Sequence, residues 1–153
     1  MRVLLSFNPD DVALAEAFRA SLFIASPDLE VFFSPCLFEG YQTLEFRDAD
    51  ALLLFVAWHG LTDQQMREYQ AAVERTGTET KFGVIPVLAG GAQAPQSLPG
   101  HLKWIEAPVV TDRTILRQVA AALSQFHIGS EMVANTTDRR RSSRVGRLRR
   151  IFG

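Results

Sequence analysis

Short apolar runs recur along the chain and predict β-strands. They cover residues 2–7, 31–33, 51–57, 82–88 and 102–106. Strands buried on both faces of a parallel sheet show such nearly unbroken runs, whereas half-exposed strands alternate apolar and polar residues. The fifth run, LKWIE, is short, and we expect it at an edge of the sheet.

The first predicted helix follows the run 2–7. Asn8 is a good N-cap, and Pro9 suits the first helical position. Beyond them, Leu14, Phe18 and Leu22 recur at the spacing of one helix face. This stripe predicts an amphipathic helix that packs on the sheet and ends near residue 25.

Two further helices are predicted later in the chain. Thr62 and Gln65 fit a capping box, and the helix they begin is expected to run to about Thr76. Thr111 is the predicted cap of the last helix. Residues 34–49 show no sustained period, so we expect a loop there with at most one helical turn.

Strand and helix alternate through residue 126, which favours a parallel sheet with helices on both faces. The simplest arrangement is a flavodoxin-like, doubly wound α/β fold with five mainly parallel strands in the order 2-1-3-4-5. We expect residues 1–128 to form this domain.

Length and composition are those of one soluble globular domain. The chain has 153 residues, of which 47% are hydrophobic and 22% charged. The longest apolar run, Ala51 to Trp58, is too short to cross a bilayer, and residues 1–20 lack the pattern of a signal peptide. Cys36 is the only cysteine, so no disulfide can form within the chain. We therefore expect a cytoplasmic protein without a transmembrane segment.

Charge is divided unevenly along the chain. Residues 131–153 hold seven arginines and two acidic residues, a net charge of +5, while the remainder holds nine basic and fifteen acidic residues, a net charge of −6. We therefore interpret residues 129–153 as a basic, arginine-rich C-terminal tail or linker. Such a segment is often a solvated connection to a fused or partner domain, but it can also bind polyanions such as nucleic acid or an anionic membrane. The sequence leaves these alternatives open.

The carboxyl ends of the predicted strands indicate where a ligand would bind, since ligands of doubly wound sheets lie beyond these ends. The residues expected along this rim are Phe7, Asn8, 34–40, 58–60 and 89–91. The helix that follows the third strand carries Glu68 toward the same rim. Its apolar face is formed by Met66, Tyr69 and Val73, with Glu68 on the flank, so periodicity alone predicts a solvated glutamate.

Several chemistries are disfavoured by the residues at this rim. No glycine-rich phosphate motif follows any strand, and Asp10 and Asp11 occupy the positive end of the first helix. A phospho-receiver domain needs an aspartate at the end of the third strand, where this chain has Trp58 and His59. The histidines lack partners at metal-ligand spacing, so we expect no metal site.

Residues 2 to about 126 resemble a TIR (Toll/interleukin-1 receptor) domain of the bacterial type. VLLSFNPDD is similar to the first strand and turn of the family: Ser6, Phe7 and Asp11 match, and Asn8 replaces a serine. DADALLLFVAWHG resembles the third strand, and FGVIPVLAGG with LPGHLKWIE resembles the fourth strand and the segment after it. The resemblance implies the doubly wound TIR fold.

The BB loop of the family has a counterpart in VFFSPCLFEG. Leu37 and Gly40 match, and Ser34 replaces the usual aspartate. In the family, the BB loop of one subunit completes the site of its neighbour, so the resemblance implies self-association. This chain lacks most of the helix that normally follows the loop.

Enzymatic members of the family carry W-x-x-x-E on the helix after the third strand, and its glutamate is catalytic in the cleavage of NAD+. Gln64 stands at the tryptophan position of this chain and Glu68 at the glutamate position. The resemblance therefore implies that Glu68 is the catalytic residue. The residues expected to bind substrate, as motif matches or as rim aromatics that stack on nicotinamide or adenine, are Phe7, Asn8, Leu37, Gly40 and Trp58.

A single carboxylate is sufficient for this reaction, because nicotinamide is a good leaving group and the transition state resembles an oxocarbenium ion. We therefore expect an NAD+ glycohydrolase or ADP-ribosyl cyclase of a bacterial TIR defence or signalling protein, with NAD+ as substrate and no cofactor. The alternative is a non-catalytic TIR interaction module, a scaffold or adaptor. Gln64 in place of tryptophan and the shortened segment after the BB loop favour this alternative.

Overall fold

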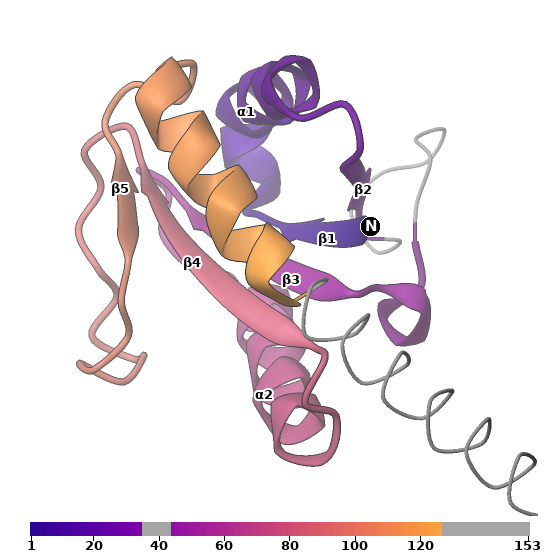
Figure 1. Ribbon diagram of the computed structural model, residues 1–153. Coiled ribbons are helices and arrows are strands. Elements are labelled where there is room, and N and C mark those ends of the chain that lie inside the picture. The colour runs from indigo at the N-terminus through magenta and orange to yellow at the C-terminus, as the bar shows by residue number, and fades with distance from the viewer. Residues whose placement is uncertain (35–43, 127–153) are drawn as a thin grey trace, which may run out of the picture.

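Five strands form one sheet in the computed structural model, which describes residues 1–34 and 44–126 (Figure 1). The strands are β1 (Arg2–Ser6), β2 (Glu30–Phe33), β3 (Ala51–Val56), β4 (Gly83–Ala89) and β5 (Ile105–Ala107). Every pairing is parallel, and the order is β2-β1-β3-β4-β5. The predicted flavodoxin-like, doubly wound arrangement is confirmed.

Helices cover both faces of the sheet (Figure 1). The helix α1 (Val12–Ala25) and the helix over residues 113–126 pack on one face, and α2 (Asp63–Thr78) packs on the other. Two short 3-10 turns, η1 (Pro9–Asp11) and η2 (Phe46–Asp48), precede α1 and β3. The turn η2 is the single helical turn that the sequence predicts between the second and third strands.

The side chains of β1 divide the core into two layers. Val3 and Leu5 pack with α1 and the helix over residues 113–126, whereas Leu4 packs with Leu52 and with Ala72 of α2. All of these residues are almost completely buried. Burial of one leucine-sized side chain stabilises a fold by about 1.5–3 kcal/mol, so both core layers contribute to the stability of the sheet.

The capping box at the start of α2 is confirmed. The Thr62 hydroxyl accepts a hydrogen bond from the Gln65 N–H at 3.1 Å, and Gln65 Oε1 accepts one from the Thr62 N–H at 3.1 Å. The helix continues past the predicted end and includes Gly77. The cap residue Thr62, two residues after Gly60, therefore fixes where α2 begins.

Two boundaries differ from the sequence prediction. The last helix is capped by Asp112 rather than Thr111, because Asp112 Oδ1 accepts a hydrogen bond from the Thr114 N–H at 2.8 Å. Both residue types are good caps, and pattern alone rarely decides between neighbouring positions. The strand β5 begins only at Ile105, since Leu102 takes part in a turn in which its N–H donates to Pro99 O at 3.3 Å.

The predicted tail lies outside the described residues, as does the segment over residues 35–43. Within residues 1–34 and 44–126, no helix combines the length and the hydrophobicity needed to span a membrane.

Candidate functional site

Gln65 fixes the start of α2 over the sheet. Its side chain is buried, and Nε2 donates to Phe55 O at 2.9 Å and to Ser6 O at 3.2 Å. These carbonyls lie near the carboxyl end of β3 and at the carboxyl end of β1. A buried amide that satisfies two buried carbonyls is costly to displace. The first turn of α2 is therefore held across the ends of these two strands.

Glu68 lies one turn further along α2 and is buried. The residue is 8% exposed, and neither carboxylate oxygen has a hydrogen-bond partner among the described residues. The solvated position that periodicity alone predicts is therefore wrong. Periodicity considers α2 alone and does not include neighbours from elsewhere in the chain, such as Ser34, a buried residue directly after β2 that lies close to the carboxylate. Glu68 is thus placed at the carboxyl end of the sheet, on the side of β2.

Burial raises the pKa of Glu68 to about 7, while the nearby side chains of Gln64 and Ser34 act in the opposite direction. Burial is the largest of these effects, so the pKa is raised overall although Gln64 and Ser34 lie close to the carboxylate. An unpaired buried carboxylate is unfavourable for folding, and groups of this kind are concentrated at functional sites.

Asp11 and His59 connect the turns that follow β1 and β3. The Asp11 side chain is almost completely buried, and its Oδ1 lies 2.5 Å from His59 Nδ1. Its Oδ2 accepts a hydrogen bond from the His59 backbone N–H at 3.3 Å. The hydrogen bond that His59 makes to the Asp11 carboxylate raises the pKa of His59; burial opposes this increase, and the charges of Asp11 and Asp10 add to it. The imidazole is held at the rim with its other nitrogen directed away from Asp11.

Asn8 uses its side chain to hold the same turn. Its Nδ2 donates to His59 O at 3.1 Å and to Gly60 O at 3.4 Å, and its Oδ1 accepts from the Asp10 N–H at 3.0 Å. Gly60 has a φ of 76°, a conformation that glycine adopts without strain. Asn8 therefore lies at the rim as predicted, but its polar atoms are engaged within the protein.

Trp58 presents a flat aromatic surface at the rim. The residue is 69% exposed, yet its Nε1 donates a hydrogen bond to Gly90 O. The ring lies directly against the backbone of Gly90, where an added Cβ would come within 3.1 Å of it. An exposed indole held in this way is suited to stack on another ring. The structure thus places Trp58 where the sequence predicted a stacking residue.

Phe7, another predicted substrate-binding residue, does not reach the surface of the rim. Phe7 is fully buried, and its ring packs edge-on against Phe33 with centroids 4.9 Å apart. Its side chain points into the α1 layer of the core, because it continues the alternation of β1. Leu37 and Gly40 lie outside the described residues.

The sheet order arranges the described rim residues in a row. Trp58 contacts Gly90 beyond β4, His59 contacts Asp11 beyond β1, and Glu68 lies near Ser34 beyond β2. Neighbouring strands are about 4.8 Å apart, so the row from the end of β2 to the end of β4 spans about 14 Å. A ligand with a reactive centre at one end and an aromatic ring at the other would fit this layout.

Sequence reasoning missed the Asp11–His59 contact and the anchoring role of Gln65. The contact had a detectable signal: the two residues follow strands 1 and 3, which are neighbours in the predicted order. The anchoring role of Gln65 had no sequence signal beyond its place in the capping box, because its long-range partners are backbone carbonyls.

No group of three or more potential metal ligands occurs in the described part of the chain.

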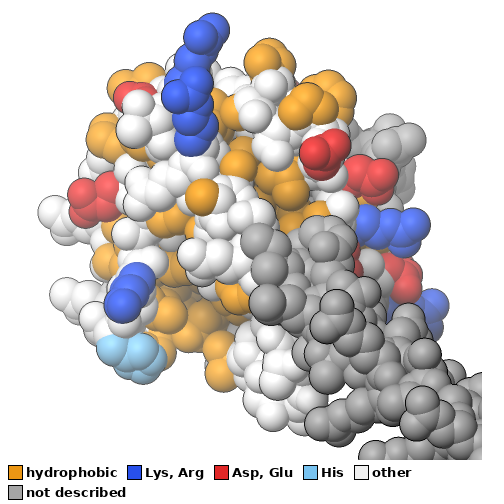
Figure 2. Space-filling view, viewed as in Figure 1, with side chains coloured by type: hydrophobic (Ala, Val, Ile, Leu, Met, Phe, Trp, Pro, Cys, Tyr) orange, Lys and Arg blue, Asp and Glu red, His pale blue; other side chains and the backbone are white. Residues whose placement is uncertain are grey.

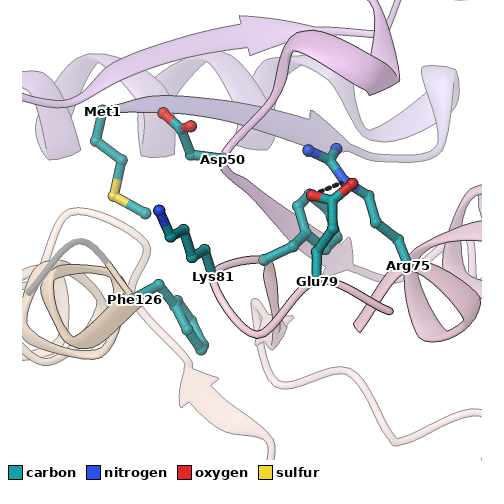
Figure 3. A pocket seen from close by; sticks show the side chains of 7 residues that line it. Met1, Asp50, Arg75, Glu79, Lys81 and Phe126 are labelled. Atoms are coloured by element: carbon teal, nitrogen blue, oxygen red, sulfur yellow. Dashed lines mark hydrogen bonds and ion pairs between the residues drawn. The ribbon is translucent and has the colours of Figure 1, made fainter. Parts of the chain in front are cut away.

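A small cavity of about 150 Å³ lies at the opposite, amino end of the sheet (Figure 3). Its lining includes Met1, Asp50 and Phe82, which directly precede β1, β3 and β4. Arg75 and Glu79, also in the lining, form an ion pair at 3.0 Å. Since ligands of doubly wound sheets bind at the carboxyl ends of the strands, we do not assign this cavity as the functional site.

The chain was also compared with known proteins. It matches no protein-family model, no curated protein and no solved structure. The function is therefore inferred from the rim itself, where a buried acid, an oriented imidazole and an exposed indole lie along the carboxyl ends of the strands.

Proposed function

We propose that the chain is a TIR-type NAD+ glycohydrolase or ADP-ribosyl cyclase of a bacterial defence or signalling protein, and that Glu68 is its catalytic residue. The observation that carries this proposal is the Glu68 carboxylate, which is buried at the carboxyl ends of the strands and lacks a hydrogen-bond partner among the described residues. The parallel sheet with order β2-β1-β3-β4-β5 agrees with the fold that the TIR resemblance implies.

The chemistry of the reaction explains why an unpaired acid is useful. Breaking the bond between nicotinamide and ribose develops positive charge on the sugar, and a nearby carboxylate stabilises that charge most strongly where water is excluded. A carboxylate without internal partners is also free to accept hydrogen bonds from the ribose hydroxyls. In this proposal Glu68 acts in its ionised form, so its raised pKa makes cleavage increase with pH around neutrality.

Trp58 supports the same proposal from the other end of the row. NAD+ carries an aromatic ring system at each end, and the exposed face of the indole offers a stacking surface for one of them. The hydrogen bond from Nε1 to Gly90 O restricts rotation of the indole, which lowers the entropy lost when a ring stacks on it. NAD+ is the substrate in this account, and no cofactor is required.

A second candidate is the non-catalytic TIR interaction module, acting through self-association. Phe23 and Ile24 of α1 are 59% and 78% exposed, beside a surface hollow of about 950 Å³ next to the edge strand β2. Hydrophobic side chains reach the surface over the α1 side of the molecule in Figure 2. The hollow is also lined by Arg19 and Glu30, two residues of opposite charge that can pair between two copies across a two-fold axis.

One experiment separates the two candidates. The protein is incubated with NAD+, both free in solution and clustered on beads, and released nicotinamide is measured by chromatography. The enzymatic proposal expects nicotinamide release, with more turnover per chain when the chains are clustered. Absence of release in both forms, together with a dimer in sedimentation that Ile24→Glu dissociates, would favour the interaction module.

A further inference from the structure

The contact between Asp11 and His59 leaves one imidazole nitrogen in a defined direction. The Asp11 carboxylate faces His59 Nδ1 at 2.5 Å and also accepts the His59 backbone N–H at 3.3 Å. In the neutral ring, the proton is therefore held on Nδ1, and Nε2 carries the free lone pair. The His59 side chain is 53% exposed while that of Asp11 is 2% exposed, so a buried acid orients an accessible base.

Holding the turn together does not by itself explain this arrangement. Asn8 already ties the turn to η1 through its hydrogen bonds to His59 O and Gly60 O. These two bonds involve only backbone atoms of the turn, so they would form with another side chain at position 59. The imidazole of His59 adds a group that can gain and lose a proton near neutral pH.

The surrounding charges favour proton transfer over the binding of an anion. Asp10 and Asp11 are the charged groups that act on His59, and both are negative. A phosphate group at Nε2 would be repelled by these carboxylates, which already neutralise a protonated ring. The same carboxylates raise the pKa of His59 and so strengthen it as a base whenever the ring is neutral.

We propose that His59 Nε2 accepts the proton of the water molecule that attacks the anomeric carbon of the ADP-ribosyl group, with Asp11 as its positioning residue. This inference rests on the function proposed above. His59 follows β3 and Ser34, next to Glu68, follows β2; these strands are two spacings apart in the sheet, or about 10 Å between strand ends. Side chains that reach toward each other from these two strand ends can face a sugar and a water molecule between them.

The step is balanced without an oxidant or reductant. The bond between the anomeric carbon and the nicotinamide nitrogen breaks, and its electron pair leaves with nicotinamide, which becomes neutral. A bond forms between the same carbon and the water oxygen, and one water proton passes to His59 Nε2. The proton is later released to solvent, which gives ADP-ribose, nicotinamide and one proton.

The test uses a second acceptor that has no proton to lose. A pyridine base such as 3-acetylpyridine attacks the ADP-ribosyl carbon through its ring nitrogen and gives an exchanged dinucleotide, whereas water needs a proton acceptor. The full chain is incubated with NAD+ and 3-acetylpyridine, and both products are quantified. The variant His59→Asn keeps an amide donor toward Asp11 but removes Nε2, whereas His59→Gln places an amide near Nε2 that cannot accept a proton.

For both variants we expect hydrolysis to fall by about tenfold or more while base exchange persists, since exchange does not need a general base. His101→Asn, a change at an exposed histidine, should retain the wild-type ratio of products. An unchanged ratio in His59→Asn, or an equal loss of both products, would overturn the inference. Persisting exchange also shows that the variant is folded. If the wild-type protein gives neither product, the proposed function fails, and this inference fails with it.

Discussion

The side-chain Nε2 of Gln65 donates a hydrogen bond to the backbone oxygen of Phe55 at 2.9 Å. The same nitrogen donates to Ser6 O at 3.2 Å, so one amide joins α2 to two neighbouring strands. This contact determines where α2 starts over the sheet, and therefore where Glu68 lies.

Gln65→Leu should destabilise the protein. The substitution preserves approximate volume but leaves two buried carbonyls without this donor, which costs about 1–3 kcal/mol in the free energy of unfolding. It also removes one half of the capping box. Urea denaturation of the variant, beside Gln70→Leu at an exposed position of the same helix, measures the effect. Equal stability of the two variants would show that the amide does not anchor α2.

Glu68→Gln should stabilise the protein at alkaline pH and leave it nearly unchanged at acidic pH. Burial raises the pKa of Glu68 from 4.5 to about 7, so the folded state keeps a proton that the unfolded state has lost. Wild-type stability is therefore lost as pH rises from 4.5 to 7, by about 3 kcal/mol in total, and the glutamine variant avoids this loss. Chemical denaturation of both proteins at pH 4.5 and pH 8 tests this. If wild type and Glu68→Gln differ in stability by the same amount at pH 4.5 and at pH 8, the pKa of Glu68 is not raised by burial.

Trp58 fluorescence should report the binding of an aromatic ring. The chain has two tryptophans, so Trp104→Phe leaves Trp58 as the single emitter and Trp58→Phe leaves Trp104. Titration with NAD+ or AMP should quench Trp58, because a stacked ring contacts the exposed indole face, and should leave Trp104 largely unaffected. Quenching confined to Trp104 would place the ligand elsewhere.

Removal of residues 131–153 should weaken the binding of polyanions and leave the stability of the fold almost unchanged. This segment holds seven arginines, and few of its residues are apolar, so the midpoint of thermal unfolding should change little. Binding to a polyanion such as heparin should weaken, and the salt dependence of that binding should become smaller. A large fall in the unfolding midpoint would instead assign the segment a structural role.

The sequence predicted the sheet well because each strand carries its own signal. The apolar runs of β1, β3 and β4 are buried almost throughout, and the order of the strands follows from the alternation with helices and from short connections. A helix start is harder to predict where either of two neighbouring residues can act as the N-cap, as with Asp112 and Thr111.

The candidate site was less predictable because its features depend on contacts distant in sequence. Helical periodicity assigns Glu68 to a solvated flank, whereas in the fold the residue is buried, with Ser34 from beyond β2 close to its carboxylate. Phe7 looked like a rim aromatic, but the alternation of β1 directs its ring into the core. The contact between Asp11 and His59 joins residues 48 positions apart, which no local pattern reveals.

The most direct test of the proposed function compares nicotinamide release from NAD+ by wild-type protein, Glu68→Gln and Glu74→Gln. Glu74 is an exposed glutamate of the same helix and serves as the matched control. We predict that Glu68→Gln lowers the rate about 100-fold or more, the usual effect of removing one group that stabilises transition-state charge, while Glu74→Gln matches wild type. The wild-type rate should also rise with pH near 7, as Glu68 loses its proton. Equal rates for all three proteins, or no release by any of them when clustered, would contradict the assignment of Glu68 as the catalytic residue.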